Sequence, residues 1–331
     1  MNALVTGGGG FLGGQIARLL LERGDRVTIL GRGQYPQFGA DVRTCRADVR
    51  EAQAVADACR GQDVVFHVAA KTGIWGPTKE FWQINADGTR NVIAGCRGHG
   101  VPRLVYTSSP SVVFGKDDLC GVDESQPYPK RYLAAYPASK AAAEQAVLAA
   151  NGPDLATVAL RPHLIWGPGD PHLIPRVIER ARSGRLVQVG DGDNLVDITY
   201  IDNAAEAHLR AADALQPSAV GAGRPFFISQ GEAVNLWSWL GELLNALGIP
   251  RPKRAISFRT AFRAGAAMEM LYKSLRMRSE PRMTRFLASQ LAKSHFFCVD
   301  AARRDFGYRP AVTTQMGVDR LLEWLRSMAR P

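Results

Sequence analysis

Short apolar runs alternate with longer amphipathic segments from the first residues of the chain. The runs predict strands over residues 4–6, 26–30, 43–47, 64–70, 103–108, 155–160 and 225–229. Between them, apolar side chains three and four residues apart predict helices over residues 11–23, 51–59, 81–97 and 136–150. Strands that alternate with helices in this way predict an α/β fold, a Rossmann-type doubly wound parallel sheet.

The regular alternation loosens after residue 165. Pro168, Gly169, Pro171 and Pro175 lie close together, and further helices are predicted over residues 173–184, 203–215 and 235–247. We therefore expect an NAD(P)-binding Rossmann domain over residues 1–165, with a further strand near residues 225–229. A smaller, mostly helical C-terminal lobe that faces the substrate is expected over residues 166–331.

Positive charge is concentrated in one part of this lobe. The 331-residue chain has a formal net charge of +10, and residues 251–285 hold ten Lys or Arg against Glu269 and Glu280. This segment is either a solvated basic face or a surface that attracts a lipid membrane, an acidic partner or a carboxylated substrate. No recognisable nucleic-acid-binding module accompanies it, so we expect no nucleic acid partner.

Composition is otherwise ordinary for a globular protein, with 46% hydrophobic and 22% charged residues. No apolar stretch reaches the roughly 18 residues of a membrane span, and the chain starts directly with a predicted strand, so no signal peptide is expected. The five cysteines form no Cys-x-x-Cys pair, and the histidines lack metal-ligand spacing. We therefore expect free thiols, a cytoplasmic location and no metal.

A glycine-rich loop joins the first predicted strand to the first helix. Gly7, Gly10 and Gly13 follow the pattern Gly-x-x-Gly-x-x-Gly. The first glycine permits a tight turn, the second lets the backbone approach a pyrophosphate, and the third allows close packing of helix on strand. The strand–loop–helix context predicts a dinucleotide site.

The end of the second strand indicates which dinucleotide is bound. An acidic residue there binds the ribose hydroxyls of NAD, whereas this chain has Arg32 between two glycines. A guanidinium suits a 2′-phosphate, so we favour NADP(H) and leave NAD(H) open. Asp48, after the third strand, is either a hydrogen-bond acceptor for adenine or the cap of the helix that starts near residue 51.

Tyr136 and Lys140 lie four residues apart and share one helical face. The ammonium is expected to favour phenolate and to lower the tyrosine pKa from about 10, which suits a proton donor. Ser109 ends the fifth strand and is a candidate for holding a carbonyl oxygen. Asn85 is expected on the buried face of its helix, as a structural anchor or as part of a polar relay.

In combination these motifs resemble the extended short-chain dehydrogenase/reductase superfamily, and within it the 3β-hydroxysteroid dehydrogenase-like branch. The matching segments run in order: residues 6–13, Asp48, 67–70, Asn85 with 88–89, 106–109, Tyr136 with Lys140, 161–162, 167–170 and 200–203. The resemblance implies that Tyr136 donates the proton, Lys140 tunes it and binds the ribose, Ser109 orients the carbonyl and Asn85 supports the site. Further cofactor contacts that we expect are Phe11, Leu12, Val49, Ala69, Ala70, Lys71, Thr107, Pro162 and Ile165.

Within that branch the chain is most similar to bacterial 2-alkyl-3-oxoalkanoate reductases of long-chain olefin biosynthesis. The similarity is carried by residues 106–112, 160–170, 254–258 and 302–308. It implies NADPH-dependent reduction of a lipid-like β-keto acid, in a homodimer that could associate with pathway enzymes or a membrane surface. Three alternatives stay open: a 3β-hydroxysteroid or sterol-4-carboxylate dehydrogenase, a sugar-nucleotide epimerase, and a cofactor-binding regulator without turnover.

Overall fold

The computed structural model describes residues 1–216 and 218–328. Its centre is a seven-stranded sheet in which every neighbouring pair is parallel. The strands lie in the spatial order β12 (Arg224–Ile228), β7 (Ala156–Pro162), β5 (Arg103–Thr107), β4 (Val64–His67), β1 (Asn2–Thr6), β2 (Arg26–Gly31) and β3 (Val42–Arg46). This order confirms the predicted doubly wound parallel sheet, and the chain reverses direction across the sheet between β1 and β4.

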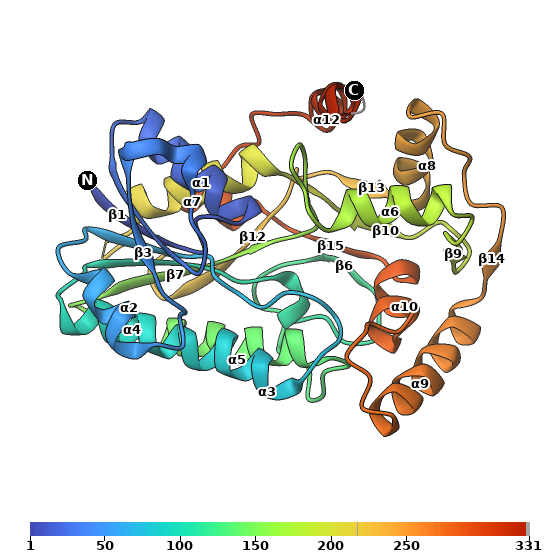
Figure 1. Cartoon of the computed structure of the whole chain (residues 1–331), viewed down its shortest axis with the longest axis horizontal. Helices are drawn as coiled ribbons and strands as arrows, with labels where there is room; N and C mark the ends of the chain where they lie inside the picture. Colours follow the sequence, from blue (N-terminus) through green and yellow to red (C-terminus); the bar gives the residue numbers. More distant parts are fainter. Residues whose placement is uncertain (217, 329–331) are drawn as a thin grey trace.

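Helices cover both faces of the sheet, as the cartoon shows (Figure 1). One layer holds α1 (Phe11–Glu22) and α7 (Ile201–Ala214), which pack on each other. The other layer holds α2 (Ala52–Cys59), α4 (Gly88–Gly98) and α5 (Ala135–Ala149). Strand residues such as Leu4, Val65 and Leu104 are fully buried between the layers, because a parallel sheet covered on both faces has no solvent side.

The helix predicted over residues 81–97 is divided into three parts. It begins as α3 (Thr78–Phe81), continues as a π-helical turn over Trp82–Asp87 and ends as α4. Such π turns are rare in proteins overall, but those that occur are often found at functional sites. Here the turn carries Asn85, which is almost fully buried against the first turn of α5.

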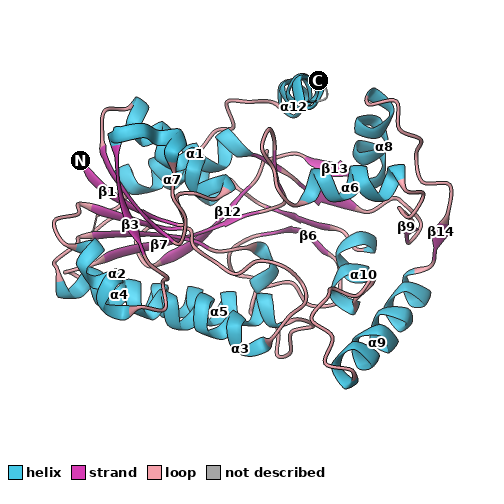
Figure 2. Cartoon of the chain, viewed as in Figure 1, coloured by secondary structure: helices cyan, strands magenta, loops and turns pink. Residues whose placement is uncertain are grey.

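The second lobe is built around a small four-stranded sheet, visible apart from the central sheet (Figure 2). Its strands lie in the order β13 (Ala233–Asn235), β10 (Leu195–Asp197), β15 (His295–Phe297) and β6 (Leu119–Val122). Two-stranded pairs add β8 (Ile165–Trp166) with β11 (Thr199–Tyr200) and β9 (Gln188–Val189) with β14 (Ala255–Ile256). The sequence did not indicate this sheet, and its edge strand β6 comes from the first half of the chain.

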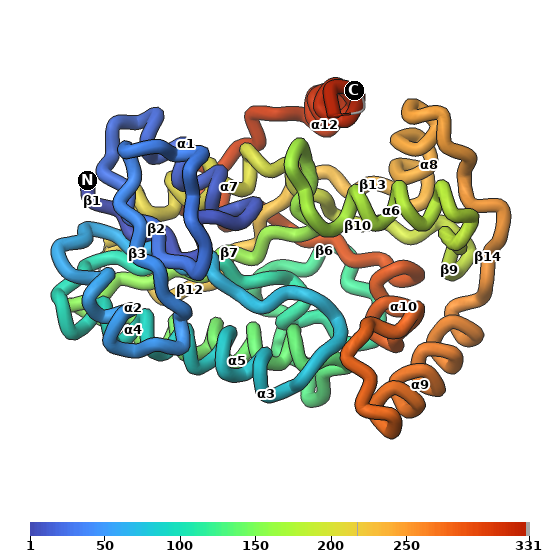
Figure 3. Tube along the Cα trace, in the orientation of Figure 1, coloured from blue at the N-terminus to red at the C-terminus, as the bar shows by residue number. Residues whose placement is uncertain are grey.

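Helices complete the second lobe. They are α6 (Leu173–Arg182), α8 (Leu236–Ala246), α9 (Phe258–Ser274), α10 (Arg285–Ala292), α11 (Asp300–Phe306) and α12 (Thr314–Met328). The basic helix α9 and its neighbour α10 lie at the end of the molecule opposite β1–β3 (Figure 3). In the structure β12 and α7 belong to the first lobe and β6 to the second. The division of the chain at residue 165 stays a prediction. Residues 329–331, at the end of the predicted second lobe, lie outside the described residues.

Candidate active site

A crevice of about 830 Å³ opens at the carboxyl ends of the central strands, beside the glycine loop. This is the edge of a doubly wound sheet where ligands bind. All of the residues predicted to contact the cofactor line it: Gly7, Gly10, Phe11, Leu12, Gly13, Arg32, Asp48, Val49, Ala69, Ala70, Lys71, Thr107, Tyr136, Lys140, Pro162 and Ile165. Ser109 lines it as well, whereas Asn85 lies behind its wall.

The glycine loop has no room for side chains. Gly7 adopts a left-handed φ of +71°, and a Cβ there would lie 2.9 Å from the backbone of Ala69. A Cβ on Gly13 would lie 2.3 Å from the carbonyl oxygen of Gly7. Gly10 caps α1 without a side-chain hydrogen bond, so the first-turn N–H groups face the crevice. The bare loop and the uncapped helix start fit a pyrophosphate.

The adenosine end of the crevice carries positive charge. The Asp48 carboxylate accepts hydrogen bonds from the Arg50 guanidinium at 2.9 Å and from the Arg50 backbone N–H at 3.0 Å. The bond from Arg50, with Arg32 nearby, lowers the pKa of Asp48. The capping alternative for Asp48 is wrong, because α2 starts at Ala52 with Glu51 as its uncapped N-cap. Since Arg50 neutralises Asp48, the charge of Arg32 is not cancelled there.

Tyr35 was missed by the sequence reasoning, because nothing in its loop marks it. Its ring lies against the glycine loop: a Cβ on Gly9 would meet it at 1.8 Å, and one on Gly31 would lie 2.2 Å from its hydroxyl. The hydroxyl accepts a hydrogen bond from the Gly33 N–H at 3.1 Å. Tyr35 therefore lines the crevice between the loop and the end of β2, where the adenosine ribose is expected.

Tyr136 and Lys140 both face the crevice from the first turns of α5. Burial raises the pKa of Tyr136, and only the nearby Ser109 hydroxyl acts in the other direction. Our expectation that Lys140 lowers this pKa is wrong, because desolvation of the phenolate dominates and the net shift is upward. The phenol is consequently protonated at neutral pH and is available as a donor.

Lys140 is 3% exposed and donates to the Thr107 carbonyl oxygen at 2.5 Å. Its ammonium also lies 4.2 Å from the centre of the Tyr106 ring. Burial lowers the pKa of Lys140 from 10.5 to about 7, with Glu144, one turn further along α5, acting in the opposite direction. Near neutral pH the Lys140 side chain is thus divided between its charged and neutral forms.

Glu144 belongs to a buried ion pair behind this face of the helix. The Arg161 guanidinium, from β7, donates to its two carboxylate oxygens at 2.9 and 2.6 Å, and the Tyr128 hydroxyl donates at 2.6 Å. The side chains of Arg161 and Glu144 are 2% and 0% exposed. The pair fixes α5, and with it Lys140, to the central sheet.

Three serines follow β5, and the structure separates them. Ser108 and Ser109 line the crevice, whereas Ser111 does not. The Ser109 oxygen also accepts from the Ser111 N–H at 3.2 Å, which fixes the turn after the strand. The Ser108 hydroxyl is buried without a hydrogen-bond partner among the described residues.

Asn85 forms part of a buried polar chain beneath the crevice. Its amide bonds the backbone N–H and carbonyl of Lys71 at 2.7 and 3.1 Å and donates to the Ser139 hydroxyl at 2.9 Å. Ser139 donates in turn to the Tyr136 carbonyl at 2.9 Å. On the other side Thr89 links the Asn85 carbonyl to His67. These contacts favour the structural-anchor interpretation, in which Asn85 holds the crevice wall against the start of α5.

Two acidic residues at the crevice, Glu80 and Asp170, were not predicted as site residues. Lys71 pairs with Glu80 at 3.0 Å across the crevice mouth. Asp170 caps α6 by accepting from the backbone N–H groups of residues 172–174. Asp170 belongs to a motif quoted for the family resemblance, which was the only signal for it in the sequence.

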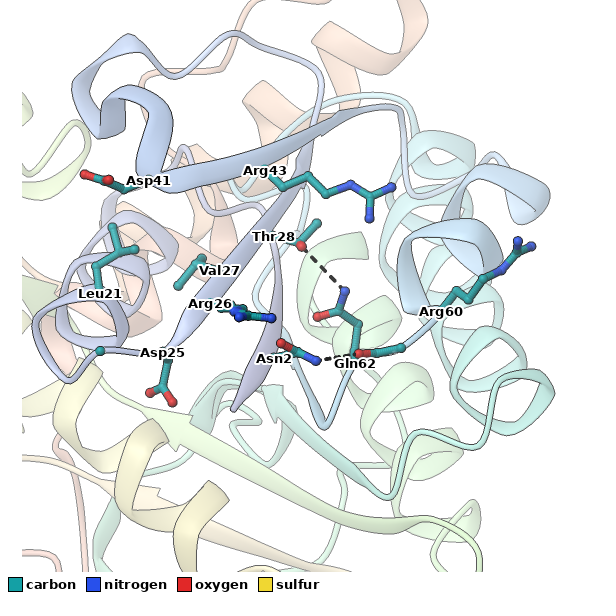
Figure 4. A pocket seen from close by; sticks show the side chains of 12 residues that line it. Asn2, Leu21, Asp25, Arg26, Val27, Thr28, Asp41, Arg43, Arg60 and Gln62 are labelled. Carbon is teal, nitrogen blue, oxygen red and sulfur yellow. Dashed lines mark hydrogen bonds between the residues drawn. The ribbon is translucent and has the colours of Figure 1, made fainter.

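A separate cavity of about 560 Å³ lies at the other end of the sheet, near the starts of β1 and β2 (Figure 4). Asn2, Arg26 and Thr28 line it, and Gln62 donates weakly to the Thr28 hydroxyl at 3.5 Å. Ligands of doubly wound sheets bind at the carboxyl ends of the strands. This cavity is therefore not a candidate for the active site.

The similarity to known proteins agrees with the geometry. The profile of the 3-beta hydroxysteroid dehydrogenase/isomerase family matches residues 4–259. The chain belongs to the 3-beta hydroxysteroid dehydrogenase/isomerase family. A Stenotrophomonas maltophilia 2-alkyl-3-oxoalkanoate reductase is 53% identical to it, over 97% of this chain and 98% of the relative. The mouse sterol-4-alpha-carboxylate 3-dehydrogenase, decarboxylating, is 34% identical over 96% and 89% of the two chains.

Among solved structures, MoeE5 in complex with UDP-glucose and NAD superposes with a TM-score of 0.75, at 25% identity and with 100% of both chains covered. The 3-beta hydroxysteroid dehydrogenase/isomerase family is NAD(P)-dependent, and its members are named as dehydrogenases and reductases. The chain is accordingly an oxidoreductase that acts on a CH–OH or C=O group. Within residues 1–216 and 218–328, no helix is both long and apolar enough to cross a membrane.

Proposed function

We propose that the protein reduces a 2-alkyl-3-oxoalkanoate, a long-chain β-keto acid, to the 2-alkyl-3-hydroxyalkanoate with NADPH in olefin biosynthesis. The observation that carries the proposal is the convergence of Tyr136, Ser109 and Lys140 on the crevice beside the glycine loop. The full-length relative at 53% identity supports this substrate class.

The residues of the chain divide the work as follows. When bound, the nicotinamide supplies a hydride to the ketone carbon. Tyr136 gives its hydroxyl proton to the ketone oxygen, and Ser109 donates a hydrogen bond to the same oxygen as negative charge develops. Lys140 holds positive charge beside the phenolate that Tyr136 leaves, and binds the ribose.

The preference for NADPH is part of the proposal. Arg32 at the end of β2, and Arg50 in the neutralising bond to Asp48, leave the adenosine end able to hold a 2′-phosphate. Replacing Arg32 by serine is expected to raise KM for NADPH at least tenfold and to change KM for NADH little. Equal loss with both cofactors would contradict the assignment of Arg32 to the phosphate.

The reaction is tested by following NADPH oxidation with purified protein and three substrates: a 2-alkyl-3-oxoalkanoate, a steroid ketone and a sugar nucleotide. We expect turnover with the keto acid and a loss of roughly 10²–10⁴ in kcat for Tyr136→Phe, with the fold retained in circular dichroism. Full activity of Tyr136→Phe would rule out the proton-donor role.

A second candidate is a sterol or steroid 3-dehydrogenase, which the 34% identity to the mouse enzyme favours. Oxidation of a 3β-hydroxysteroid with NAD, in the absence of keto acid reduction, would select it. The homodimer, the cytoplasmic location and the association with pathway enzymes or a membrane stay predictions.

A further inference from the structure

A third cavity, of about 750 Å³, lies behind the first turn of α5. We call it the α9 pocket; it is enclosed by residues 74–78, 130–135 and the end of α9 with the turn that follows, 272–278. Its size is within the roughly 300–1,000 Å³ of pockets that bind small molecules. None of the candidate catalytic residues lines it.

The α9 pocket shares its inner wall with the crevice. Thr72 lines the crevice and Ile74 the pocket, while Tyr136 lines the crevice and the preceding Ala135 the pocket. A third segment, the start of the helix after Pro77, contributes to both cavities in the same way. Residues one or two apart in the chain thus line the two cavities, which places the pocket directly beside the crevice.

Aromatic rings line the pocket, and the polar atoms of two of them, Trp75 and Tyr132, are already bonded. Trp75 donates from its indole nitrogen to the Met277 carbonyl at 3.2 Å and packs edge-on to Tyr272, with 6.0 Å between ring centres. The Tyr132 hydroxyl donates to the Val112 carbonyl at 2.8 Å. The rings thus present apolar faces to a ligand. Trp75 also joins the walls that come from the two lobes.

The rim of the pocket is strongly basic. Lys130, Arg131, Lys273, Arg276 and Arg278 line it, and none of them forms an ion pair with a described residue. The one acidic lining residue, Glu269, is bound by Arg285 at 2.8 Å. Five cations without an ion-pair partner among the described residues, next to aromatic rings, favour a ligand with an apolar body and an anionic group.

We propose that the α9 pocket binds one alkyl arm of a carboxylated long-chain substrate, and that its basic rim attracts the carboxylate from solution. This inference rests on the proposed reduction of a long-chain β-keto acid. The basic segment seen in the sequence is then part of the substrate site.

The test uses decanoate, hexanoate and decanol as probes, because none of them has a ketone to reduce. Binding to the full chain is measured by calorimetry and by the fluorescence of Trp75 and Trp82, which both line the pocket. Each buried methylene is worth about a fourfold gain in affinity, so decanoate is expected to bind at least tenfold more tightly than hexanoate. The fluorescence change is expected to disappear in the double variant Trp75→Phe/Trp82→Phe.

Charge is tested with a matched pair of variants. Lys273→Ser/Arg278→Ser removes two rim cations and is expected to weaken decanoate at least fivefold while leaving decanol unchanged. Arg259→Ser/Arg263→Ser removes two exposed cations of the same helix that do not line the pocket and is expected to change neither. Equal weakening by both pairs, or none by the first, would overturn the inference, as would affinity independent of chain length.

Failure of this inference is distinguishable from failure of the proposed function. If the wild-type enzyme reduces a 2-alkyl-3-oxoalkanoate and decanoate does not bind, the pocket assignment alone is wrong. If decanoate binds as described and no keto acid is reduced, the proposed function is wrong, and the substrate role of the pocket falls with it.

Discussion

Replacing Arg161 by methionine removes one half of the buried ion pair that holds α5 against the central sheet. Glu144 then loses two hydrogen bonds, of 2.9 and 2.6 Å, and keeps the one from Tyr128. Its side chain is fully buried, so water cannot replace the guanidinium. Breaking such a pair costs about 3–5 kcal/mol. Because one charged hydrogen bond remains, we expect a loss of about 3 kcal/mol in the free energy of unfolding.

The measurement is urea unfolding at pH 7 followed by circular dichroism. The double variant Glu144→Leu/Arg161→Met replaces both charges by apolar groups and is expected to lie within about 1 kcal/mol of wild type. One nitrogen of Arg161, Nη1, has no partner among the described residues, so the native pair is itself imperfectly compensated.

Arg210→Met serves as the control, since it breaks the exposed Arg210–Glu206 pair on α7 and is expected to cost less than about 0.5 kcal/mol. The reasoning is refuted if Arg161→Met lies within about 1 kcal/mol of wild type. It is equally refuted if the double variant is no more stable than the single one.

Three further predictions concern the site and its surroundings. Lys140 has a pKa lowered from 10.5 to about 7, so between these pH values the folded state binds fewer protons than the unfolded state and the free energy of unfolding rises with pH. Lys140→Met should therefore be most stabilised relative to wild type at pH 6. This stability advantage, measured by thermal unfolding, should be smaller by about 2–3 kcal/mol at pH 9. Gly13→Ala, which drives a Cβ into the Gly7 carbonyl, should abolish dinucleotide binding in calorimetry, whereas Gly14→Ala, with its nearest atom at 3.4 Å, should keep it. Arg276, in the turn that follows α9, has a φ of +51°, so Arg276→Gly should be about 1 kcal/mol more stable than Arg276→Ala in urea. Equal stability of the two variants would contradict a strained turn.

The central sheet was predictable because each of its strands carries its own signal. The apolar run over residues 64–67 and the glycine loop before α1 can each be recognised from a few neighbouring residues. Together such signals predicted a parallel sheet, and with it the edge at which Tyr136 and the cofactor residues meet. The strand predicted over residues 64–70 ends at His67, since the residues after it leave the sheet to line the crevice. Propensity could not show that the Arg50 guanidinium binds Asp48, or that α2 starts at Ala52 with Glu51 at its N-cap.

Long-range pairing accounts for the rest. Residues 119–122 have neither length nor alternation to mark a strand, and they form β6 only because β15 lies beside them. The pKa of Tyr136 depends on the burial of its ring, which no spacing of residues reveals. The cluster of cations at the α9 pocket likewise appears only when residues 130–131 and 273–278 are brought together.

The pairing of β6 with β15 bears on how the chain is made. Leu119 meets His295 in the register, so a strand synthesised early waits for its partner until nearly the whole chain has been translated. At about 5–20 residues per second this interval lasts on the order of ten to thirty seconds. During that time β6 has an open edge, the feature that invites wrong pairing between chains. The nascent protein is thus most exposed to aggregation between completion of the central sheet and emergence of residues 295–297, and holding chaperones should engage it in that window.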